Sequence, residues 1–145
     1  MQYGGGAVRG DNRAVLTAIF EGLAVGDGRA FVEALAEDFT WTMIGSTGWS
    51  GVYRGKAAVR GELLRPLMMR FKSYRNTARR FIVEGDWAAV QCTGDAETLD
   101  GKRYDNNYCW VVRFRGGRMT ELTEYMDTEL VREALGPFER TSAAQ

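Results

Sequence analysis

One acidic residue near the C-terminus is flanked by apolar residues on the same face of an expected strand. Side chains alternate between the two faces of a strand, so residues 118–126 place Leu122, Glu124 and Met126 together. If this face points inward, desolvation raises the pKa of the Glu124 carboxyl and makes it a usable acid or base near neutral pH. A register one residue different would instead put Glu124 on the outer face.

The chain contains no histidine, and this limits the chemistry available to it. A histidine base and a serine–histidine pair are excluded, as is the most common metal ligand, which Cys92 and Cys109 do not replace. Carboxylates, tyrosines, amides, lysines, arginines and water remain. These groups support proton transfer without a cofactor or a metal.

The segment before Glu124 supplies groups that can assist a carboxylate. On one face of residues 104–114, which we expect to point inward, aromatic and apolar residues gather with one amide: Tyr104, Asn106, Tyr108, Trp110, Val112 and Phe114. Asn106 and Tyr108 are candidate substrate-binding groups, because an amide and a phenol can stabilise a developing enolate oxygen. Trp110, and Trp41 from an earlier strand, are candidates for packing the apolar body of a substrate. Tyr108 and both tryptophans also fit an ordinary core.

The first half of the chain alternates between helical and strand patterns. Apolar residues recur at helical spacing after Asp11 and again at residues 31–35, whereas residues 39–43 alternate as in a strand. Residues 56–70 also have a helical pattern. It contains Pro66, which we expect to end or kink the helix.

The second half is expected to be mainly strands joined by glycine-containing turns. The strands are predicted near residues 74–84, 87–98, 103–115 and 118–126. A final helix begins near Asp127, for which an N-cap role is favoured over a catalytic one, and stops at Gly136. Helices followed by antiparallel strands predict one α+β domain over residues 11–136, with flexible termini at 1–10 and 137–145.

Composition limits the partners and the location of the protein. A chain of 145 residues suits one domain. Its 19 basic residues equal its 19 acidic ones, which argues against a nucleic-acid partner. No segment has the length and apolarity of a membrane-spanning helix or the apolar core of a signal peptide. These features favour a cytoplasmic protein with neither nucleic-acid nor membrane partners.

Three segments, in this order and spacing, resemble the SnoaL-like branch of the nuclear-transport-factor-2-like superfamily. They are residues 38–41 with 51–59, residues 101–108, and residues 117–128. The resemblance implies a conical half-barrel, in which a curved antiparallel sheet with helices on its concave side encloses a pocket. It also implies a homodimer formed through the outer face of the sheet. The family includes polyketide cyclases, limonene-epoxide-type hydrolases, ketosteroid isomerases, dehydratases and binding modules, so the fold leaves the reaction open.

The resemblance also implies site residues. Glu124 aligns with the catalytic carboxylate of the limonene-epoxide-hydrolase-like members, and Asp95 matches an aspartate that contributes to their catalysis. Thr93 stands where those members have an arginine, and Trp41 and Met43 stand where they have a tyrosine and an asparagine. These departures argue against epoxide hydrolysis by that mechanism. Asp95 is alternatively a solvated residue near a hairpin.

Together these features predict a cofactor-independent enzyme of the isomerase, cyclase, lyase or hydrolase type. Glu124 would be the general acid or base, Asp95 would assist it, and the substrate would be a small apolar metabolite. The alternative is a non-catalytic ligand-binding or dimerisation module. In such a module the pocket would be filled by Trp41, Met43 and Trp110, whereas an enzyme would keep it open around a buried Glu124.

Overall fold

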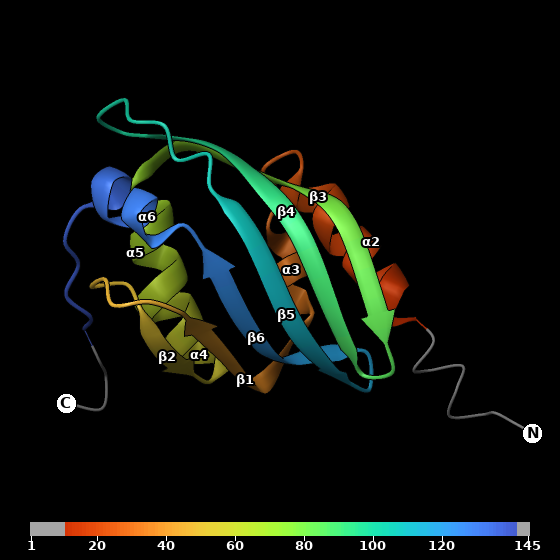
Figure 1. The fold of residues 1–145 in the computed structure, drawn as a ribbon. Coiled ribbons are helices and arrows are strands. Elements are labelled where there is room, and N and C mark those ends of the chain that lie inside the picture. Colours follow the sequence, from red (N-terminus) through yellow and green to blue (C-terminus); the bar gives the residue numbers. More distant parts are fainter. Residues whose placement is uncertain (1–10, 142–145) are drawn as a thin grey trace, which may run out of the picture.

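Six strands form one curved sheet in the order β2–β1–β6–β5–β4–β3, with helices packed against it (Figure 1). The structure is a computed structural model and describes residues 11–141. The strands are β1 (Leu35–Met43), β2 (Gly51–Arg54), β3 (Phe71–Glu84), β4 (Trp87–Thr98), β5 (Asn107–Arg115) and β6 (Arg118–Met126). The α+β class and the curved sheet are confirmed.

The sheet is mixed, whereas the sequence predicts an antiparallel one. β3 to β6 form the expected meander, but β1 pairs in parallel with β6, with Trp41 opposite Leu122. Parallel neighbours need a long crossover rather than a tight turn. Here the crossover contains β2, a helical segment and three further strands, so the pairing joins parts of the chain that local patterns cannot relate.

The helical elements are α2 (Asn12–Leu23), α3 (Arg29–Glu33), α4 (Lys56–Ala58), η1 (Val59–Leu64), α5 (Arg65–Met68) and α6 (Thr128–Leu135). The predicted helix at 56–70 changes type along its length: α4 passes into the π-helical turn η1 and then into α5, where Pro66 lies in the first turn. Proline lacks the N–H that would bond back one turn, so the wider turn before it has a direct cause.

Asp127 is the N-cap of α6, as predicted. Its carboxylate accepts hydrogen bonds from the backbone N–H groups of Glu129 and Leu130, at 3.0 and 3.3 Å. The helix ends before Gly136, whose positive φ of 72° suits glycine. This carboxylate is therefore used to start a helix.

A β-bulge between β5 and β6 changes which side chains face inward. The pairing shifts between Arg113 and Phe114, so Thr120 has no partner in the ladder. The shift turns Met119 inward, and it is fully buried, whereas strict alternation with Glu124 facing inward would place it on the outer face. Beyond the bulge the predicted alternation holds, and Glu124 lies on the inner face with 4% of its surface exposed.

The segment after α6 packs against the body of the protein, although flexibility is predicted from residue 137 onward. Phe138 stacks on Trp49 with 3.7 Å between ring centroids. Arg140 lies over the ring of Tyr53 at 3.8 Å and donates a hydrogen bond to the Val52 carbonyl at 2.8 Å. Aromatic partners from the β1–β2 region therefore hold a tail that is polar in sequence.

Residues 1–10 and 142–145, for which flexibility is also predicted, lie outside the described part of the chain. Between residues 11 and 141, no helix combines the length and the apolar character needed to cross a membrane.

Candidate active site

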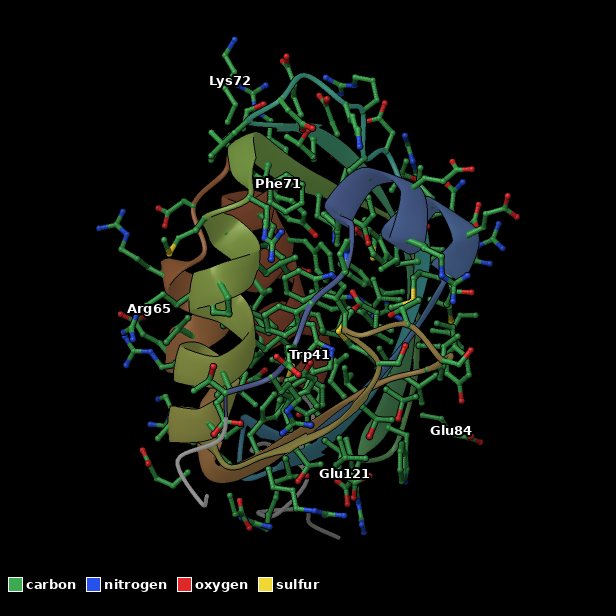
Figure 2. All side chains as sticks on the ribbon, turned by 90° about the vertical axis from the view of Figure 1, so that its left-hand side faces the viewer. Trp41, Arg65, Phe71, Lys72, Glu84 and Glu121 are labelled. Carbon is green, nitrogen blue, oxygen red and sulfur yellow. The ribbon has the colours of Figure 1, made fainter. Side chains whose placement is uncertain are left out.

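A cavity of about 800 Å³ lies between the helical segments and the inner face of the sheet. Its wall is mostly apolar and contains Phe31, Trp41, Leu67, Phe71 and Trp110. Figure 2 shows Trp41 in the interior, between the sheet and the helical segment that carries Arg65. The pocket predicted by the resemblance is therefore present, and it is open: Trp41, Met43 and Trp110 line it rather than fill it.

Glu124 supplies the buried carboxylate of this cavity. Strand pairing places it opposite Trp110 of β5 and next to Met43 of β1. The indole Nε1 of Trp110 donates a hydrogen bond to Glu124 Oε2 at 2.8 Å. Within residues 11–141 no lysine or arginine forms an ion pair with this carboxylate.

Burial raises the pKa of Glu124 from 4.5 to about 7, because the ionised form loses its hydration. The N–H groups of Trp110 and Trp41 oppose this rise only in part. The Trp41 N–H lies close enough to act on the pKa, yet by distance and angle it has no hydrogen-bond partner in the described chain. Near neutral pH both protonation states of Glu124 are therefore populated.

Three tyrosines add phenol groups to the same cavity: Tyr74, Tyr104 and Tyr108. The hydroxyls of Tyr74 and Tyr108 lie 3.3 Å apart. Burial raises the pKa of all three phenols well above the usual value. They therefore stay protonated and can donate hydrogen bonds to a bound oxygen.

Charged residues other than Glu124 lie at the exposed edge of the cavity. Arg29 is paired with Asp27 at 2.7 Å. Arg60, Lys72 and Arg75 are exposed and form no ion pair within residues 11–141. Figure 2 shows Lys72 extending outward at one end of the molecule. Among the described residues, no cation therefore offsets the desolvation of Glu124.

Asp95, predicted to assist Glu124, lies away from the cavity. It occupies an exposed position on β4 and forms an ion pair with Arg103, which also pairs with Asp105 at 2.7 Å. Alternation along β4 is the cause, because the neighbouring Ala96 points inward and is fully buried. The solvated position that the sequence left open for Asp95 is the one observed.

Asn106 is buried, as predicted, but its amide is hydrogen-bonded to the protein backbone. Nδ2 donates to the Asp127 carbonyl at 3.0 Å. Oδ1 accepts from the backbone N–H groups of Asn107 and Asp127, at 2.8 and 3.0 Å. The side chain therefore fastens the start of β5 to the end of β6, and it is not part of the cavity wall.

Four of the site residues proposed from the sequence line the cavity: Glu124, Tyr108, Trp41 and Trp110. Asp95 and Asn106 do not line it. The structure adds Tyr74 and Asn76, which sequence reasoning missed. Their spacing of two within the expected strand at 74–84 was the available signal. That spacing could not show which face of β3 meets the pocket. Within residues 11–141, no three cysteine or acidic side chains come close enough to hold a metal ion.

A curved sheet that encloses an apolar cavity with one buried carboxylate defines a cone-shaped α+β domain with an interior pocket. The chain belongs to the SnoaL-like domain family, whose model matches residues 16–122. The family and fold include polyketide cyclases and other small-molecule enzymes, together with many proteins of unknown function. No curated protein matches the chain.

Several solved structures have the same fold as this chain. An NTF2-like protein of unknown function from Burkholderia pseudomallei superposes with a TM-score of 0.75 at 22% identity, over 86% of this chain and 96% of that one. TerC, crystallised with polyporic acid, gives 0.73 at 22% identity, over 86% and 97%. A Jannaschia protein assigned as a SnoaL-like polyketide cyclase gives 0.73 at 14% identity, over 89% and 94%. At these identities the similarity establishes the fold alone.

Proposed function

We propose that this protein is a cofactor-independent enzyme that transfers a proton on a small, mostly apolar, oxygenated molecule. One observation carries the proposal: Glu124 is buried in an open apolar cavity, hydrogen-bonded to an indole N–H and, within residues 11–141, paired with no cation. A carboxyl group whose pKa is about 7 can accept a proton and return it at neutral pH. This is the requirement for isomerase, cyclase or lyase chemistry.

The arrangement suggests how the proton would move. Ionised Glu124, held by Trp110, removes a proton from a carbon next to a substrate carbonyl. Negative charge then develops on the carbonyl oxygen, where a phenol of Tyr108 or Tyr74, or the unpartnered N–H of Trp41, can donate a hydrogen bond. Protonated Glu124 returns the proton at a second carbon, or the enolate expels a leaving group or closes a ring. In a hydrolytic variant the same carboxylate would activate water.

The rival function is ligand binding without chemistry. An enzyme would accelerate proton exchange on a bound ketone, whereas a binding module would not. β-Tetralone is a suitable probe because it is a two-ring ketone with acidic C–H bonds beside its carbonyl. In heavy water at neutral pH, the protein is expected to accelerate loss of those proton NMR signals above the buffer rate, and the acceleration should saturate with ketone. Saturable binding without any acceleration would contradict the enzyme and favour the binding module.

We further propose that the outer face of the sheet forms a homodimer. Cys109 and Val111 of β5 and Thr123 of β6 are partly exposed there, and Tyr125 is 47% exposed. Val111→Arg is expected to convert a dimer to a monomer in light scattering, because it places a charge within the contact. Ala57→Arg, on the exposed surface of α4, is the matched control and should stay dimeric. A monomeric wild-type protein would contradict this proposal.

A cytoplasmic location is proposed from the cysteines. Cys92 is buried, whereas Cys109 lies half-buried, and both thiols are free. Two unpaired thiols suit a reducing compartment.

A further inference from the structure

Asn76 of β3 is a fully buried amide that has no hydrogen-bond partner in the described part of the chain. Its side chain is 0% exposed, and neither Nδ2 nor Oδ1 meets a partner within residues 11–141. It lies in the wall of the cavity, two residues from Tyr74 on the same face of the strand. Buried polar groups are nearly always satisfied, so an unpartnered amide in a cavity wall indicates a missing partner.

The protein itself offers Asn76 only a weak partner. The Cys92 thiol is near enough for the amide to lower its pKa slightly against the larger effect of burial. No hydrogen bond between the two side chains meets normal geometry, and a thiol is a poor hydrogen-bonding group. The residue directly opposite Asn76 on β4 gives no help, because it is Gly94, which has no side chain.

We infer that Asn76 binds an oxygen atom of the ligand and is a second polar anchor, distinct from the one at Glu124. The inference rests on the proposed use of the cavity and adds the substrate class. An amide both donates and accepts, so it suits a hydroxyl or a carbonyl group.

The positions of the two anchors define the shape of that substrate. Glu124 is on β6 and Asn76 is on β3, three strand spacings apart, which is about 14 Å measured across the strands. The two are also offset along the strands, because the ladder from Glu124 reaches β3 at Phe81 and not at Asn76. The wall between them carries Trp110 and Tyr108. The ligand is therefore an elongated ring compound with an oxygen function at each end and an apolar middle.

A series of three probes of similar shape tests this inference: para,para′-biphenol, para-phenylphenol and biphenyl, which carry a hydroxyl at both ends, at one end and at neither. Wild-type protein should bind the biphenol most tightly. Asn76→Val should weaken biphenol binding by roughly threefold to tenfold, the effect of one net hydrogen bond, and leave biphenyl binding unchanged. Asn76→Thr, which has nearly the shape of valine but keeps a hydroxyl, should retain part of the preference.

The controls separate binding from structure. Thr77→Val makes the corresponding exchange on the exposed side of β3 and should change no affinity. Asn76→Val should unfold at a temperature no lower than Asn76→Thr, because it removes a group that has no partner. Equal wild-type affinity for the three probes, no detectable binding, or equal loss for biphenyl in Asn76→Val would each overturn the inference. Selective unfolding of Asn76→Val would also overturn it, because a partner within the protein would then be satisfying the amide.

These binding measurements need no turnover, so the inference and the proposed function can fail separately. A biphenol preference that depends on Asn76, without exchange on β-tetralone, would leave a binding module with this anchor. Exchange without the preference would leave the enzyme and remove the anchor.

Discussion

Glu124→Gln is expected to slow proton exchange on β-tetralone by at least about a hundredfold, the usual contribution of a general base. Glutamine has the size of glutamate, and its carbonyl oxygen can still accept the Trp110 N–H that now bonds Oε2 at 2.8 Å. The cavity and the fold should therefore persist. Only the ability to take up a proton is lost.

The comparison uses a second glutamate from the same strand. Glu121 is exposed and lies 3.7 Å from Arg113, and Figure 2 shows it at the outer edge of the molecule. Glu121→Gln should keep the wild-type exchange rate. For Glu124→Gln the maximal rate should fall while the ketone still binds. If Glu124→Gln exchanges protons as fast as wild type, the proposed role of this carboxylate is wrong.

The same carboxylate should make wild-type stability depend on pH. The pKa of Glu124 is about 7 in the folded protein, against 4.5 for an ordinary glutamate, so between these pH values the folded state holds a proton that the unfolded state has released. Its stabilising contribution is therefore complete below about 4.5 and is lost as pH rises through 7. The difference corresponds to roughly 3 kcal/mol of unfolding free energy.

Urea unfolding of wild type and Glu124→Gln between pH 5 and pH 8 measures this contribution. The variant should gain stability relative to wild type as pH rises, because glutamine has no charge to bury. Asp27, Asp100 and Asp105 have lowered pKa values and act in the opposite direction at acid pH. Both proteins contain these aspartates, so their effect cancels in the difference. Parallel pH profiles would show that the Glu124 carboxylate is not desolvated.

The expected exchange and the expected pH dependence both require Glu124 to face inward, and this orientation was predictable from the sequence. Alternation along a strand is a local property, since each side chain points opposite to the one before it. The pattern in residues 122–126 and the aromatic face of residues 104–114 therefore favoured an inward position for Glu124 and Trp110, and both are buried. The N-cap at Asp127 was equally local, because the cap and its donors lie within three residues.

The positions of Asp95 and Asn106 show the limit of this reasoning. Alternation placed Asp95 on one face of β4 but did not say which face meets water, and the resemblance favoured the wrong one. Asn106 was placed inside correctly, yet two of its three hydrogen bonds are to backbone groups of Asp127, 21 residues away. Whether a buried amide is free for a ligand depends on which backbone groups reach it, and its own neighbours in sequence do not reveal this.

By itself, then, the sequence determined the absence of histidine chemistry, the inward face of β5 and β6, and the carboxylate that this face carries. Only the tertiary structure decided that β1 returns in parallel to bring Trp41 beside the site, and that β3 contributes Tyr74 and Asn76. The physical reason is the distance along the chain over which each feature is determined. Alternation and capping are set by backbone geometry over a few residues, whereas a cavity wall and its unpartnered groups are set by contacts between strands far apart in the chain.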